Sequence, residues 1–243
     1  MYYKEFLRMR NAVKWLAISL AVMLVAHAAL HLFVAGMSSN SGGATNFVGI
    51  FGTAALVIGG IMATVFGSTL AYENDGHLEV AWTKPHSRTE YATTAMLVNA
   101  AGIMFCVLMS FFAFVLTWLT PGMHEQVTWN LSPSTANELL GFALFPLAWY
   151  AVIVALSARL RGGALVQSLI WPVALVLLAL HQIPFTPVWH SLFAALNIVN
   201  PLSYVSLMGG RDVNTRSFAA VALALFALGG WAFATIQWRR LEA

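Results

Sequence analysis

Six long apolar runs, separated by short polar segments, dominate the chain. About 20 consecutive apolar residues are enough for a helix to cross the hydrocarbon core of a bilayer. The runs predict six transmembrane helices, at roughly 14–36, 46–71, 93–119, 138–157, 164–182 and 217–237. The pattern therefore predicts an all-α integral membrane protein, with residues 1–243 forming a single transmembrane domain.

Residues before the first run form an amphipathic pattern. Tyr2, Phe6 and Met9 share one helical face, whereas Lys4 and Arg8 lie on another. Basic amphipathic helices often lie in the membrane interface. We therefore predict an N-terminal interface helix. A simple extension of the first span is the alternative.

The segment between the fifth and sixth spans is too apolar for a solvated loop. Pro184, Pro187 and Pro201 divide it into pieces that are too short to cross a bilayer. Short apolar pieces broken by proline predict re-entrant or interfacial helices before the sixth span.

Composition and charge support this topology. Only 9% of the 243 residues are charged and 60% are hydrophobic, whereas about a quarter of a soluble domain is charged. With both termini in the cytoplasm, the basic residues on the cytoplasmic side are Lys4, Arg8, Arg10, Lys14, Lys84, Arg88, Arg159, Arg161, Arg239 and Arg240. Only Arg211 and Arg216 would then lie outside. Excess Lys and Arg mark cytoplasmic segments, so this orientation is the one predicted.

Small residues in the second span form a smooth stripe. Gly59, Ala63 and Gly67 recur every four residues, a spacing that lets membrane helices approach closely. We expect the stripe to pack within the chain rather than to form a seam between two copies.

The polar segment YENDGHLEVAWTKPHSRTEY, residues 72–91, joins the second and third spans. Helix-starting residues precede Gly76, and Pro85 forces a stop, so a helix of about two turns is predicted between them. Leu78 and Trp82 lie on its apolar face. This face either docks into a partner protein or anchors the loop on the membrane surface.

A capping pattern follows at once. Ser87-Arg88-Thr89-Glu90 has the S-x-x-E form that starts a helix, so the third span is expected to begin there. A similar pattern, Thr135 to Glu138, predicts that Glu138 caps the fourth span.

Together these features resemble the ABC-2 type permeases. In that family the loop after the second span has the form E-x-x-x-G-x-[LM]-E, then a short helix and P-x-S-R. This chain has Glu73, Gly76, Leu78 and Glu79, with one residue fewer between the first two, and then Pro85-His86-Ser87-Arg88. The sequence Val80-Ala81-Trp82-Thr83-Lys84 before the proline is more polar than the usual leucine-rich version.

The resemblance implies a function and a set of partners. The short helix would be a cytoplasmic coupling helix that seats in a separate ATPase. The residues at that contact would be Glu73, Gly76, Leu78, Glu79, Trp82, Pro85, Ser87 and Arg88. Two ATPase subunits, which would hold ATP and Mg²⁺, and a second permease, identical or related, would complete an exporter in the bacterial cytoplasmic (inner) membrane.

The chain itself carries no motif for ATP hydrolysis. None of its lysines follows a glycine, so the G-x-x-x-x-G-K-[ST] phosphate loop is absent from the sequence. It also contains no H-E-x-x-H or G-x-S-x-G, and lone Cys106 allows no disulfide framework. We therefore expect no enzymatic activity, no cofactor in this chain and no nucleic-acid partner.

Four polar residues within the spans are candidate contacts for a translocated substrate. His27 and His31 share one face of the first span, at a spacing that could hold a metal, with no third ligand evident. Intramembrane ionisable groups are functional candidates, although helix packing also explains His27, His31, Asn99 and Gln167. Packing is the interpretation favoured here.

The sequence thus favours the transmembrane subunit of an ATP-driven exporter. The alternative is a membrane anchor or receptor subunit that transports nothing and uses the 72–91 loop to dock a partner. An ion-coupled transporter based on His27 and His31 is less favoured, because the sequence shows no inverted repeat.

Overall fold

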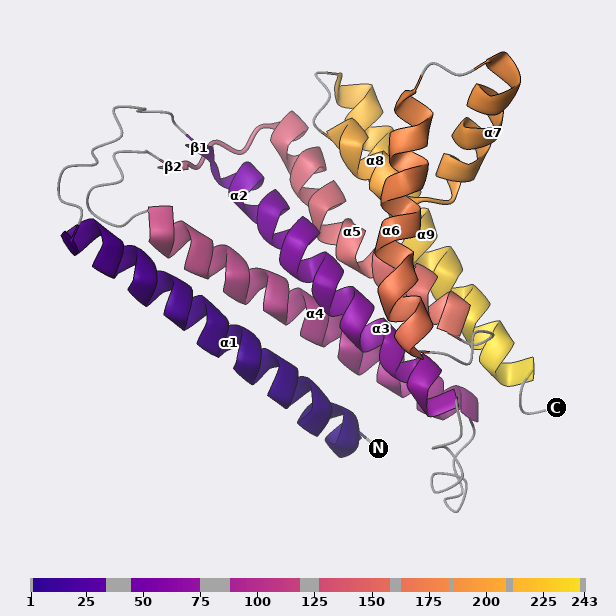
Figure 1. The fold of residues 1–243 in the computed structure, drawn as a ribbon, viewed down its shortest axis with the longest axis horizontal. Helices are drawn as coiled ribbons and strands as arrows, with labels where there is room; N and C mark the ends of the chain where they lie inside the picture. The colour runs from indigo at the N-terminus through magenta and orange to yellow at the C-terminus, as the bar shows by residue number, and fades with distance from the viewer. Residues whose placement is uncertain are drawn as a thin grey trace.

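The protein is a bundle of long helices (Figure 1). The structure, a computed structural model, describes residues 2–33, 45–74, 88–118, 127–157, 163–183, 186–208 and 212–240. Its helices are α1 Tyr2–Phe33, α2 Phe47–Thr53, the π-helix η1 Ala54–Gly59, α3 Gly60–Asn74, α4 Arg88–Trp118, α5 Pro133–Ser157, α6 Gly163–Gln182, α7 Pro187–Ile198, α8 Pro201–Met208 and α9 Val213–Arg240. Two strands, β1 Thr45–Asn46 and β2 Val127–Thr128, form a short parallel pair.

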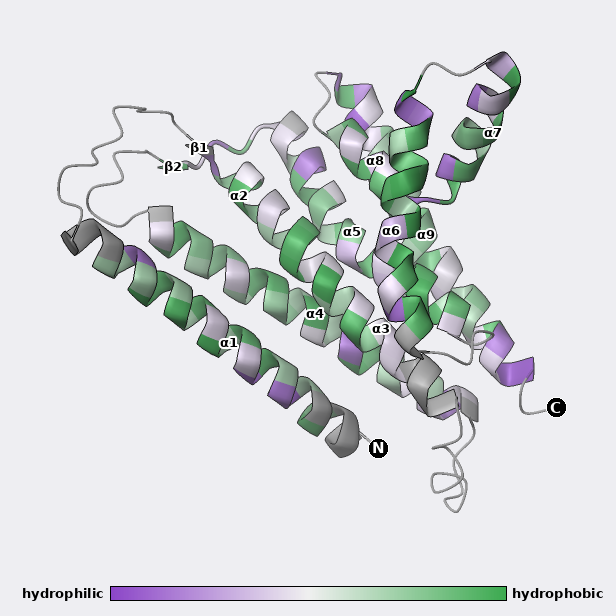
Figure 2. Cartoon of the chain, viewed as in Figure 1, coloured by the Kyte–Doolittle hydropathy of each residue, from purple (hydrophilic) through white to green (hydrophobic). Residues whose placement is uncertain are grey.

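Six of these elements are long and apolar enough to cross a membrane. They are α1, the continuous α2–η1–α3 unit, α4, α5, α6 and α9, which match the six predicted runs in order. Figure 2 shows hydrophobic residues along most of their length. The prediction of a nearly all-helical, multi-pass membrane protein is confirmed.

The first helix continues without a break through the predicted N-terminal interface segment. At about 1.5 Å per residue, a helix of this length extends roughly 48 Å, well beyond the roughly 30 Å hydrocarbon core. It packs chiefly against α4, where Leu16 and Leu20 contact Cys106 and Ala113. The structure therefore joins the N-terminal segment directly to the first span, and its location in the membrane interface stays a prediction.

The small-residue stripe of the second span packs inside the chain, as expected. A Cβ atom on Gly59 would lie 2.6 Å from Pro146 Cγ, and one on Gly67 would lie 2.6 Å from Ile153 Cγ2. Both partners belong to α5, and Ala63 between them is fully buried. The stripe therefore lets the second and fourth spans approach at van der Waals distance.

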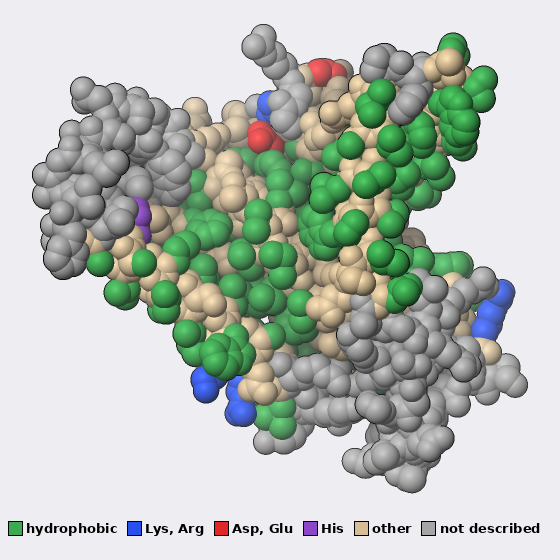
Figure 3. Space-filling view, in the orientation of Figure 1, with side chains coloured by type: hydrophobic (Ala, Val, Ile, Leu, Met, Phe, Trp, Pro, Cys, Tyr) green, Lys and Arg blue, Asp and Glu red, His purple; other side chains and the backbone are tan. Residues whose placement is uncertain are grey.

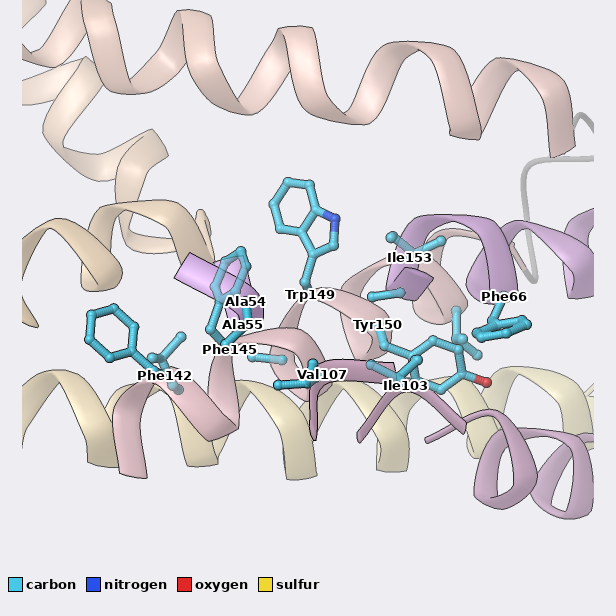
Figure 4. Close-up of a cluster of buried hydrophobic side chains, with 14 of the residues drawn as sticks. Ala54, Ala55, Phe66, Ile103, Val107, Phe142, Phe145, Trp149, Tyr150 and Ile153 are labelled. Atoms are coloured by element: carbon cyan, nitrogen blue, oxygen red, sulfur yellow. The ribbon is translucent and has the colours of Figure 1, made fainter. Parts of the chain in front are cut away.

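The fourth span, α5, is the centre of the bundle. It packs most extensively against α9 and α3, and its buried side chains include Phe145, Trp149, Tyr150 and Ile153. In Figure 4, Tyr150 lies beside Ile103, whereas the indole of Trp149 leaves α5 on another side. This helix therefore holds several spans together.

The two ends of the bundle differ in charge. The start of α1 and the end of α9 lie toward the same end of the bundle, here called the basic end, and carry Arg10, Lys14, Arg239 and Arg240. Glu138, Asp212 and Arg216 lie at the starts of α5 and α9, at the opposite end. Figure 3 shows blue side chains at the lower left and at the right, and red ones at the top beside a further blue side chain. The sequence predicts that the basic end faces the cytoplasm, and this orientation stays a prediction.

Two short helices precede the last span. α7 and α8 meet at an angle of 92° around residues 199 and 200, and each begins with a proline. We call this junction, residues 197–204, the corner. The predicted pair of short helices is present, and their re-entrant position in a membrane stays a prediction.

Candidate functional site

A long apolar groove runs between α6 and α9. It has a volume of about 1260 Å³, and α5 forms its floor. Leu165, Leu169 and Val173 form the α6 wall, one helical turn apart. About half of each of these three side chains is exposed, which shows that the groove is open to the side of the bundle. Its volume and its apolar lining make it the candidate functional site.

A compact hydrogen-bonded cluster supports the floor of the groove. The indole N–H groups of Trp149 and Trp171 both donate to Thr64 Oγ1, at 3.0 and 2.9 Å. The same hydroxyl donates to the carbonyl oxygen of Gly60 at 2.9 Å. One buried threonine of α3 thereby provides the acceptor for an indole N–H of α5 and one of α6. An indole N–H without a partner would be costly in this low-dielectric interior.

The corner is bonded to the backbone of α6. Asn200 Nδ2 donates to the carbonyl oxygen of Ala174 at 2.9 Å, and Asn197 Nδ2 donates to that of Leu177 at 2.8 Å. Asn200 Nδ2 also donates to Asn197 Oδ1 at 3.1 Å. Both asparagines are buried, so these amides fix the bend of α7–α8 against the fifth span.

The corner also reaches α9. The ring of Tyr204 contacts those of Phe218 and Phe226, with centroids 6.2 and 5.5 Å apart. Its hydroxyl donates to the carbonyl oxygen of Ile198 at 2.9 Å. Because the corner touches α6 at Ala174 and α9 at Phe226, it bridges the two walls partway along the groove.

The groove changes character toward the basic end. Phe233 and then Gln237 of α9 line it there, and Arg240 follows Gln237 by three residues on the same helical face. The Oε1 atom of Gln237 is buried and has no hydrogen-bond partner within the described part of the chain. The long apolar surface thus ends at a polar acceptor beside exposed arginines.

At the opposite end, α5 and α9 are joined by polar contacts. Arg216 Nη1 donates to Glu138 Oε2 at 3.2 Å, and Asn137 Nδ2 donates to Ser217 Oγ at 2.9 Å. The prediction that Glu138 caps the fourth span is wrong. The helix begins at Pro133, and Thr135 N donates to Ser132 Oγ at 3.3 Å, so the N-cap is Ser132, three residues before Thr135, where the predicted capping pattern begins.

The predicted polar residues of the spans lie apart from one another. Asn99 is buried, and its Nδ2 donates to Tyr150 Oη at 3.3 Å, which joins α4 to α5. Gln167 is exposed on α6, and His27 is half-buried on α1. The side chain of His31 lies outside the described set. The groove lining includes none of Asn99, Gln167 and His27.

The predicted ATPase contact falls mostly outside the described residues. Six of the residues belong to the segment 75–87, which lies outside the described residues: Gly76, Leu78, Glu79, Trp82, Pro85 and Ser87. Glu73 lies in the last turn of α3, and Arg88 is the first residue of α4. The cap predicted at Ser87 lies outside the described residues and stays a prediction.

Sequence reasoning missed the residues that shape the groove. Thr64 has no local signal, because its two tryptophan partners come from spans far along the chain. Asn197 and Asn200 could have been identified from the sequence. They form an N-x-x-N pattern just before Pro201 in a broken apolar segment. Buried amides in such a segment need partners.

Comparison with protein-family models finds no match to this sequence. Comparison with curated proteins likewise finds no match.

Proposed function

We propose that the chain is the permease subunit of an ATP-driven exporter of the ABC-2 type. The observation that carries the proposal is the order of the elements. Six candidate spans occur in one chain, a polar segment joins the second and third, and a sharply bent helix pair precedes the sixth. This is the arrangement that the sequence resemblance implies.

The packing of the second span suggests how a push from an ATPase reaches the groove. The segment 75–87 connects the end of α3 to the start of α4. α3 packs closely on α5 through Gly67, and Thr64 ties it to Trp171 of α6. A displacement of α3 would therefore move a wall of the groove, since helices so tightly packed move together.

The loop contact can be tested by replacing Trp82. In a complex reconstituted with its native ATPase, Trp82→Asp should abolish the stimulation of ATP hydrolysis by the permease, because a charge would occupy an apolar docking site. Trp82→Phe, which keeps an aromatic ring, should retain stimulation. The amount of each variant in the membrane fraction controls for insertion. Stimulation unchanged in Trp82→Asp would exclude Trp82 from the contact.

The identity of the partner separates the proposal from its alternative. Purification of the chain from native membranes should recover an ATPase with a phosphate-binding loop, and mass spectrometry would identify it. Recovery of a partner without such a loop would favour the anchor or receptor function instead.

A further inference from the structure

The part of the groove below the corner has the depth of one leaflet, and on α9 the lining continues beyond the corner to Phe218. The corner bridges α6 and α9 near Ala174 and Phe226. From Phe226 to Gln237, α9 rises about 16 Å. One leaflet contributes about 15 Å of the roughly 30 Å hydrocarbon core. The part of the groove below the corner therefore matches the length of an acyl chain from one leaflet.

The lining of the groove changes from apolar to polar toward the basic end. Its walls and floor are apolar below the corner, through residues such as Leu165, Leu169 and Phe233. At the basic end the lining finishes at Gln237, whose Oε1 lacks a partner among the described residues, with Arg239 and Arg240 just beyond. Arginines near a membrane surface attract anionic lipids.

We propose that this groove binds an anionic membrane lipid from the leaflet at the basic end. An acyl chain lies between α6 and α9 below the corner. The polar head lies near Gln237 and the two terminal arginines. The lining residues all come from this chain, so lipid binding does not depend on whether the chain transports a substrate.

Two glycines provide a matched pair of variants. A Cβ atom on Gly229, which lines the groove, would meet nothing within 4 Å, and the same holds for Gly49 on α2, outside it. Both are exposed helical positions, so the Cβ atom of a leucine has open space at either. Gly229→Leu would fill the groove, whereas Gly49→Leu would not.

The test uses the purified full chain in phosphatidylcholine vesicles that contain phosphatidylglycerol with a diazirine on one acyl chain. After illumination, mass spectrometry maps the labelled residues. Labelling should concentrate on the lower halves of α6 and α9, above that of the exposed α4 residues Phe105 and Phe112, which report on surrounding lipid. Gly229→Leu should lose the groove labelling, and Gly49→Leu should keep it.

The head group is tested separately. Arg239→Gln and Arg240→Gln should each weaken competition by unlabelled phosphatidylglycerol about fivefold, the factor for one arginine near an anionic head group. Equal labelling by a phosphatidylcholine probe with the same chains would overturn the anionic preference.

Two further results would overturn the acyl-chain site. One is groove labelling no stronger than that of α4, or unaffected by Gly229→Leu. The other is efficient disulfide formation between copies of a Leu169→Cys, Cys106→Ser variant in membranes. That result would show that a second copy covers the groove.

Discussion

Thr64 is the residue on which three spans depend. Its hydroxyl accepts from Trp149 and Trp171 and donates within its own helix. Hydrogen bonds between membrane helices are individually modest, but here one side chain satisfies two large indoles in the interior. The two rings also lie against each other, with centroids 4.7 Å apart, so the cluster sets the distance of α6 from α5.

Two replacements of Thr64 should distinguish the effect of its hydroxyl group from the effect of its side-chain shape. Thr64→Val removes the acceptor for both indole N–H groups and should destabilise the protein by about 1–3 kcal/mol. Thr64→Ser keeps the hydroxyl and should remain closer to the native stability. Thermal unfolding in detergent, followed by tryptophan fluorescence, measures the difference. Equal stability of the native protein and Thr64→Val would show that the indoles find other partners.

Some single-residue contacts were predictable from the sequence and others were not. The spacing of Gly59, Ala63 and Gly67 predicted their packing inside the chain, because a helical stripe is a local property. The pairing of Glu138 with Arg216 was missed, since it depends on two helix starts being adjacent although they lie far apart in the sequence. Local rules suggested a cap for Glu138, and the tertiary contact replaced it.

At the scale of elements, the corner combines rigidity with a sharp bend. Proline explains why α7 and α8 begin where they do, and this much was predictable from sequence. The 92° angle was not predictable, because it is held by Asn197 and Asn200 on carbonyl groups of α6.

Loss of one amide should loosen the corner. Asn200→Ala removes the bonds to Ala174 and Asn197, and we expect backbone amide exchange in α7 and α8 to rise about tenfold. Ser191→Ala on α7 removes only a bond within its own helix and should leave exchange in α8 unchanged. Hydrogen–deuterium exchange with mass spectrometry measures both. Identical protection in Asn200→Ala and the native chain would contradict this role.

For the whole molecule, the pattern of apolar runs was a sufficient guide. Each predicted run corresponds to a helix, because length and hydropathy decide which segments cross a bilayer. The ends were less predictable, as α1 and α9 both extend past their runs into basic residues. The groove could not be predicted from the sequence, since it depends on how α5, α6 and α9 pack together.

The predicted topology can be checked by labelling. In a Cys106→Ser background, Glu79→Cys should react with an impermeant maleimide only from the cytoplasmic side, and His190→Cys on α7 only from the outside. The reason is that α3 and α7 lie toward opposite ends of the bundle (Figure 1). The background variant without added cysteine should stay unlabelled. Access to both positions from one side would refute the six-span arrangement.

The π-helix η1 within the second span should make this span tolerant of a one-residue deletion. A π turn holds one residue more than an α-helical turn. Removing one residue from Ala54–Gly59 would therefore shorten η1 to a regular helix and leave the flanking segments in register. The same deletion within α3 would rotate everything beyond it by about 100° and turn Gly67 away from Ile153. This span should thus accept a missing codon at one place and reject it a few residues later.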